Sequence, residues 1–147
     1  MKEYLNNVVL GKRAIGNLIA IISSVLMLIT SIIYISIDGG QLKIVDYSRT
    51  LTFVCVLLGS LLTLSLLFFR NNILEIIFPF ASLILYAVGL GRQLYLVAYP
   101  LADLITGVNW FGGSLTIYLT MFILLLVGTL LSLVGIFLPQ NKKEEYK

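Results

Sequence analysis

The sequence contains no histidine and a single cysteine, Cys55, which lies inside a hydrophobic run. Without histidine and without a second cysteine, the chain can build neither a disulfide nor the usual zinc sites, nor a histidine acid–base pair. Charged residues are also scarce, at 12% of 147 residues, and the net charge is only +3. The positive charges lie mostly at the ends of hydrophobic runs and form no basic face, so we expect no binding to nucleic acid.

The sequence also lacks any constellation of residues that would carry out catalysis. No nucleophile has a base beside it, no two carboxylates are paired at helical spacing, and no metal ligands cluster. The stretch Gly89-Leu90-Gly91 is too short for a nucleotide-binding loop and lies within a hydrophobic run. We therefore expect a protein that is not an enzyme and that uses no cofactor and no metal.

Hydrophobic residues, in contrast, make up 59% of the chain, a proportion that indicates an integral membrane protein. Four runs reach the length of roughly 20 residues that a helix needs to cross a bilayer. Helices satisfy their own backbone hydrogen bonds in lipid, so we expect these runs to be helical. The predicted fold is all-α, a single four-helix transmembrane bundle over residues 1–147. Its spans cover about residues 14–37, 51–69, 73–98 and 114–138.

The distribution of lysine and arginine predicts the orientation of this bundle. The amino terminus, the loop after the second span and the carboxyl-terminal tail hold seven basic residues, and the other two loops hold two, with Arg92 set aside because it lies within a span. Basic residues are enriched in cytoplasmic loops, so we expect both termini in the cytoplasm, at the plasma membrane of a bacterium. Aromatic residues near the opposite boundary are expected at the level of the headgroups; they include Tyr34, Tyr95, Tyr99, Trp110 and Tyr118.

Between the third and fourth spans, residues 99–114 read YPLADLITGVNWFGGS and are much less hydrophobic than their surroundings. Pro100 is well suited to the first turn of a helix, and four apolar residues after it share one helical face. The pattern predicts a short amphipathic helix at residues 100–109, with Tyr99 and Trp110 as interfacial anchors. Such a helix lies on the outer surface of the membrane or re-enters the bundle, and the sequence leaves both arrangements open.

Arg92 is the strongest candidate for a functional charge, because charged residues inside a membrane are costly and need a partner. Gln93 adjoins it, and Asp103 follows eleven residues later. A chain reversal at Pro100 would bring Asp103 back to Arg92 as an ion pair that ties the outer helix to the third span. Alternatively, Arg92 binds an anion or an acidic lipid headgroup, which a guanidinium matches well.

Small residues recur at helical spacing within the spans, and in lipid such residues let helices approach each other closely. These stripes either hold the helices of one chain together or form the contact with another chain. The candidate helix-contact residues are Gly16, Ala20 and Ser24 in the first span, Gly59 in the second, and Gly128 and Ser132 in the fourth.

These features favour a small non-enzymatic membrane protein that serves as an accessory or scaffold subunit of a larger membrane complex. Its expected partners are the lipid bilayer and either another membrane protein or further copies of the chain. The alternative is a small homo-oligomeric channel or carrier with Arg92 near its path, although the middle of every span is apolar. An immunity-type membrane protein is a further alternative. The first span lacks the carboxylate that a small multidrug exporter would place there.

Overall fold

The computed structural model describes residues 14–37, 46–68, 71, 73–108 and 113–139, and within these residues it is helical and contains no strand. Four helices are long and apolar enough to cross a membrane, which confirms the predicted all-α fold with four candidate spans. The elements are α2 (Ile15–Ser36), α4 (Asp46–Leu64), the short 3-10 helix η2 (Ser65–Leu67), α5 (Leu74–Thr106) and α6 (Leu115–Phe137).

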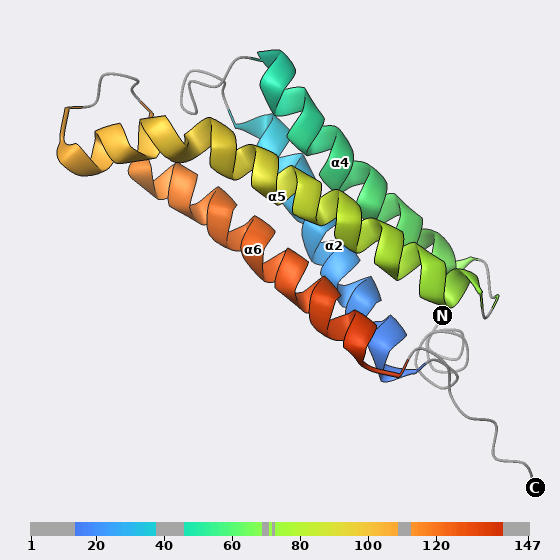
Figure 1. The fold of residues 1–147 in the computed structure, drawn as a ribbon. Coiled ribbons are helices and arrows are strands. Elements are labelled where there is room, and N and C mark those ends of the chain that lie inside the picture. Colours follow the sequence, from blue (N-terminus) through green and yellow to red (C-terminus); the bar gives the residue numbers. More distant parts are fainter. Residues whose placement is uncertain (1–13, 38–45, 69–70, 72, 109–112, 140–147) are drawn as a thin grey trace, which may run out of the picture.

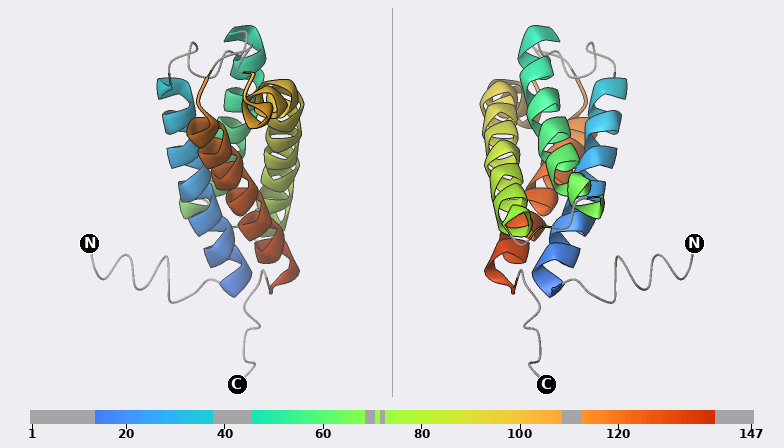
Figure 2. Two further views of the ribbon diagram at one scale, coloured as in Figure 1. Left: turned by 90° about the vertical axis from the view of Figure 1, so that its left-hand side faces the viewer. Right: turned by 90° about the vertical axis from the view of Figure 1, so that its right-hand side faces the viewer.

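The four long helices form a ring in which each packs against the next along the chain, and α6 closes the ring against α2. They run alternately in opposite directions, side by side along one common axis (Figures 1 and 2). As a result, α2 and α5 run in the same direction and face each other across the centre. We call the end that holds Ile15 and Phe137 the terminal end, and the end that holds Ser36 and Leu115 the distal end.

The bundle exposes apolar side chains and buries polar ones. Ile22, Ile84 and Ile123 each have at least half of their surface exposed, whereas Asn17 and Tyr86 are completely buried. Contact between an isoleucine side chain and lipid carries no free-energy penalty, whereas a polar group in contact with lipid loses its hydrogen bonds. Polar groups therefore gather between the helices, where they bind one another.

Small residues set the close approach of neighbouring helices. A Cβ atom added at Gly59 would lie 2.7 Å from Cε1 of Tyr86, and one added at Gly135 would lie 3.2 Å from the carbonyl oxygen of Gly16. These contacts join α4 to α5 and α6 to α2 within one chain. All six candidate helix-contact residues are buried inside the bundle; they are Gly16, Ala20, Ser24, Gly59, Gly128 and Ser132.

The prediction of a separate amphipathic helix at residues 100–109 is wrong, because α5 continues without a break to Thr106. The ribbon of α5 changes direction over its last turns (Figure 1). Pro100 lies inside this helix and cannot donate a hydrogen bond to the carbonyl of Leu96, a loss that membrane helices tolerate. The helix ends at Gly107, whose φ of 78° is left-handed, a conformation that glycine adopts without strain.

Packing explains why the helix continues past the proline. Leu101 and Leu104 pack against a buried cluster that includes Tyr34 and Tyr118. A reversal of the chain at the proline would remove these leucines from the cluster. Ile105, which belongs to the same predicted apolar face, is 69% exposed, so only part of that face contacts the bundle. Residues 109–112 lie outside the described residues.

Candidate functional site

Three hydrogen bonds cross the centre of the bundle between α2 and α5, the two helices on its diagonal. Each joins a buried side chain of α2 to a buried side chain of α5, and none of the six residues is more than 6% exposed. We call these six residues the axial column. From the terminal end to the distal end, the pairs are Asn17–Glu75 (3.3 Å), Ser24–Tyr86 (3.4 Å) and Tyr34–Gln93 (2.6 Å).

The axial column depends on long side chains, because α2 and α5 touch each other only slightly along their lengths. Tyr86 reaches from α5 across the centre and donates its hydroxyl hydrogen to Oγ of Ser24. Tyr34 reaches in the opposite direction and donates to Oε1 of Gln93. Hydrogen bonds between membrane helices contribute on the order of 0.6–2 kcal/mol each, so the three pairs together stabilise one relative position of α2 and α5.

Hydroxyl groups around the column are also used in contacts between helices. Ser23 donates to the carbonyl of Gly128 at 2.7 Å and thereby joins α2 to α6. Thr63 donates to Oγ of Ser82 at 2.7 Å, and Ser82 donates in turn to the carbonyl of Gly59 at 2.7 Å, which joins α4 to α5. These bonds link the ring of helices on two sides.

Apolar side chains fill the space around the middle pair. Met27, Val56 and Leu125 pack against Tyr86 in one buried cluster. These residues come from α2, α4 and α6, so all four helices meet at this level. The middle of the bundle is therefore packed with side chains, with the polar groups held in specific pairs.

At the distal end, Arg49 of α4 caps α2. Its Nη2 donates to the carbonyl oxygen of Ile35 at 3.0 Å, and its guanidinium lies 5.9 Å from the centroid of the Tyr34 ring. Carbonyl groups in the last turn of a helix have no partner within the helix, and a cation is favourable there. Arg49 thus stabilises the end of α2 beside the Tyr34–Gln93 pair.

The structure does not bring the members of the predicted ion pair together. Arg92 and Asp103 are eleven residues apart on the same helix, which is about 16 Å along the axis and beyond the reach of their side chains. Instead, the guanidinium of Arg92 lies 5.4 Å from the centroid of the Tyr95 ring. Its Nε atom is buried and has no hydrogen-bond partner among the described residues. Gln93, the third member of that predicted site, belongs to the axial column.

The tyrosines near the distal end divide into two groups. Tyr99 is 75% exposed, as expected of an interfacial anchor, and Tyr95 is exposed as well. Tyr34 and Tyr118, which we expected at headgroup level, are buried inside the bundle. Trp110 lies outside the described residues.

Sequence reasoning missed Tyr86, whose hydroxyl occupies the middle of the column. A signal for it exists, because a tyrosine in the middle of a span must bury its hydroxyl and needs a hydrogen-bond partner there. That signal identifies the residue but not its partner, Ser24.

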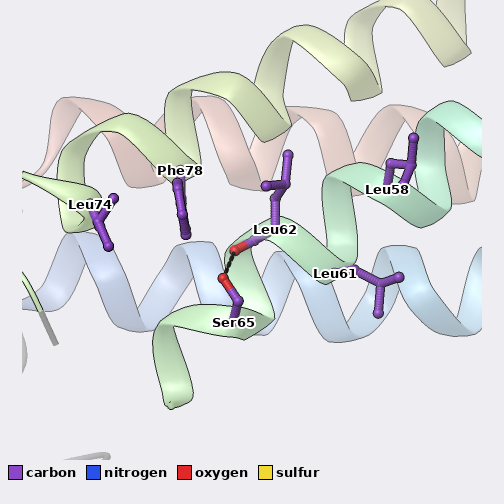
Figure 3. Close-up of a pocket in the computed structure, with 6 residues that line it drawn as sticks. All are labelled: Leu58, Leu61, Leu62, Ser65, Leu74 and Phe78. Atoms are coloured by element: carbon purple, nitrogen blue, oxygen red, sulfur yellow. Dashed lines mark hydrogen bonds between the residues drawn. The ribbon is translucent and has the colours of Figure 1, made fainter. Parts of the chain in front are cut away.

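A groove of about 450 Å³ lies between α4, η2 and the start of α5, near the terminal end. Leu74 and Phe78 line the groove from α5, and Leu58, Leu61 and Leu62 line it from α4 (Figure 3). The hydroxyl of Ser65, the one polar side chain in the lining, donates to the carbonyl of Leu62 at 2.6 Å, drawn as a dashed line in Figure 3. This groove therefore offers a ligand an apolar surface and no unused polar group.

Within the described residues, no group of histidine, cysteine, aspartate and glutamate side chains is placed to hold a metal ion. Cys55 is a buried free thiol. Comparisons with family models, with curated proteins and with solved structures return no match for this chain. We therefore infer its function from its own residues.

Proposed function

We propose that this chain is a small non-enzymatic integral membrane protein that serves as an accessory or scaffold subunit of a larger membrane complex. The observation that carries the proposal is the outward face of α5. Ala87 and Gly91 lie four residues apart on that face and are both exposed, and a Cβ atom added at Gly91 would meet nothing within 4 Å. Small residues at this spacing allow a second helix to approach closely.

Arg92 adds a polar group at the edge of this face. Its guanidinium lies 5.4 Å from the centroid of the exposed Tyr95 ring. A guanidinium near lipid is costly unless it meets an anion, and carboxylates match it in shape and charge. A partner helix that packs on Ala87 and Gly91 and carries a carboxylate near Arg92 would bind both the small residues and the guanidinium.

The interior of the bundle supports the same proposal, because its small and polar residues are already used within the chain. Gly59 packs closely against Tyr86, and Gly128 packs closely against Met27, so neither glycine is accessible to another chain. The axial column holds α2 to α5, and apolar side chains fill the middle of the bundle. Lateral binding therefore has to use an outward face, and α5 offers one with small residues.

In this proposal the protein lies in the plasma membrane of a bacterium with both termini in the cytoplasm. The seven-to-two distribution of basic residues supports that orientation. The terminal end of the bundle is then cytoplasmic, and the distal end, with Arg49 and Gln93, faces outward.

A homo-oligomeric channel or carrier is the second candidate function, and the axial column is the observation that favours it. The column places polar pairs at three depths, and one of them includes the buried carboxyl of Glu75. Arg92, which the sequence suggested near a path, lies outside the column and contacts Tyr95. Ion flux into liposomes that contain the purified protein, abolished by Glu75→Gln, would favour the carrier over the accessory subunit.

The accessory function is tested by purification in mild detergent followed by mass spectrometry of stoichiometric membrane proteins. Gly91→Leu places a bulky side chain on the proposed contact and should remove the partner while the bundle stays folded, since the site is open. Thr120→Leu is the matched control, because Thr120 is exposed on α6. Equal recovery of the same proteins with both variants, or no stoichiometric membrane protein with the wild type, would contradict the proposal.

A further inference from the structure

Another groove, of about 300 Å³, lies between α2 and α4 at the distal end of the bundle. It is lined by Tyr34 and Ile35 of α2 and by Arg49, Thr50, Phe53 and Val54 of α4. Ile35 and Val54 are 51% and 37% exposed, and Thr50 is exposed as well, so the groove opens on the outer surface of the bundle. A molecule in the surrounding lipid can therefore enter it from the side.

Arg49 brings a positive charge to this groove and is held in place from two directions. Its Nη2 donates to the carbonyl oxygen of Ile35 at 3.0 Å, and its guanidinium lies 5.9 Å from the centroid of the Tyr34 ring. A guanidinium has five N–H donors, so the cap on α2 uses only part of its hydrogen-bonding capacity. Within the part of the chain that the structure describes, no carboxylate pairs with Arg49. The groove therefore contains a fixed cation that can bind an anion.

The order of groups along the groove fits an amphipathic anion. Arg49 caps the last turn of α2 and so lies at the boundary of the membrane, whereas Phe53 and Val54 follow it four and five residues later on α4. At 1.5 Å per residue, these apolar side chains lie about 6–8 Å deeper in the bilayer than Arg49. A water-soluble anion would use only the cation, and a neutral lipid would use only the apolar part. A lipid with an anionic headgroup uses both.

We infer that the groove between α2 and α4 binds an anionic phospholipid, with its phosphate on Arg49 and one acyl chain along Phe53 and Val54. A guanidinium matches phosphate oxygens in both geometry and charge. The described lining contains no carboxylate that would pair with the ammonium of a zwitterionic lipid, so a lipid with net negative charge is favoured. Because α2 already holds the guanidinium, binding requires little further ordering of this side chain. The inference does not rest on the proposed accessory function, since the described lining includes no residue of α5.

The experiment identifies the lipid in the groove by photo-crosslinking from its rim. A diazirine side chain close in size to leucine replaces Val54 in the purified protein. The protein is reconstituted with equal amounts of phosphatidylglycerol and phosphatidylcholine that carry the same acyl chains, and the masses of the lipid adducts give the ratio of the two lipids. One basic residue near an anionic lipid corresponds to about a fivefold difference in binding. We therefore expect phosphatidylglycerol to exceed phosphatidylcholine by about that factor in the adducts at position 54.

Ile123 is the matched control position, because it is also exposed and lies eight residues after the distal end of α6, as Val54 does in α4. Adducts at position 123 should contain the two lipids in equal amounts. Arg49→Gln should bring the ratio at position 54 to about one. Arg92→Gln, which removes a charge outside the groove lining, should leave that ratio unchanged.

Three outcomes would overturn the inference. The first is an equal ratio at positions 54 and 123 with Arg49 in place, which is decisive even if Arg49→Gln fails to fold. The second is an enrichment of phosphatidylglycerol at position 54 that survives Arg49→Gln or is lost in Arg92→Gln. The third is the absence of any lipid adduct at position 54.

Discussion

Replacing Gly59 by alanine is expected to destabilise the bundle through a clash in its centre. The new Cβ would lie 2.7 Å from Cε1 and 3.0 Å from Cδ1 of Tyr86, and 3.3 Å from Cβ of Leu85. The ring of Tyr86 is completely buried and cannot swing aside like the end of a flexible chain. It also donates to Ser24, so any shift of the ring disturbs the middle pair of the axial column.

The size of this effect follows from two opposing contributions. Overpacking of a buried site costs about 1–3 kcal/mol, whereas changing glycine to alanine within a helix gains up to about 1 kcal/mol. Gly91→Ala has the same propensity gain without the clash, because a Cβ at Gly91 meets no atom within 4 Å. The difference between the two variants isolates the clash, and we expect Gly59→Ala to be less stable than Gly91→Ala by about 1–3 kcal/mol.

The measurement is the free energy of unfolding in mixed micelles of a mild detergent and dodecyl sulfate, followed by circular dichroism for both variants and the wild type. Gly91→Ala should equal or slightly exceed the wild type in stability. Ordinary surface substitutions change the free energy of unfolding by up to about 0.5 kcal/mol. If the unfolding free energies of Gly59→Ala and Gly91→Ala differ by less than that, α4 and α5 do not pack as closely at Tyr86 as described.

Further predictions concern the other contacts of the bundle. Ala20→Leu should lower the unfolding free energy in the same assay by about 1–3 kcal/mol, because Ala20 is buried and its backbone nitrogen lies close to Gly135; an unchanged value would show that this face is open to lipid. Tyr34→Phe should cost about 0.6–2 kcal/mol through loss of its hydrogen bond across the bundle, and a neutral result would contradict that bond. Arg92→Met and Asp103→Asn should be additive within about 0.5 kcal/mol, since a continuous helix separates them, and coupling above that value would favour a reversal of the chain between them.

The hydrophobic runs determine most of this fold, because lipid admits few alternatives to a helix for a long apolar segment. The ends of α2 and α6 fall within about one residue of the predicted spans. The prediction was wrong at Pro100, where the same residue suits the first turn of a new helix or, at a cost, the interior of a longer one. Packing of Leu101 and Leu104 on the buried tyrosines accounts for the continuous helix, and this contact is between residues far apart in the sequence.

The site was predictable only in part, for a related reason. The six candidate helix-contact residues, chosen for their small size and helical spacing, all lie on inward faces of the helices. Periodicity does not say which helices lie on the diagonal or how each is rotated, so Glu75 as the partner of Asn17 and Tyr34 as the partner of Gln93 became visible only with the packed bundle. The outward position of Gly91 is likewise a consequence of how α5 is rotated in the ring.

Photo-crosslinking in intact membranes tests the central claim, that another membrane protein binds the outward face of α5. A photoreactive amino acid is placed at Val88 on α5 and, in a separate variant, at Ile29 on α2. These positions are matched, being 48% and 50% exposed. We expect one discrete protein adduct from position 88 that is lost when Gly91→Leu is added, and none from position 29. No adduct from position 88, or the same adduct from both positions, would contradict it.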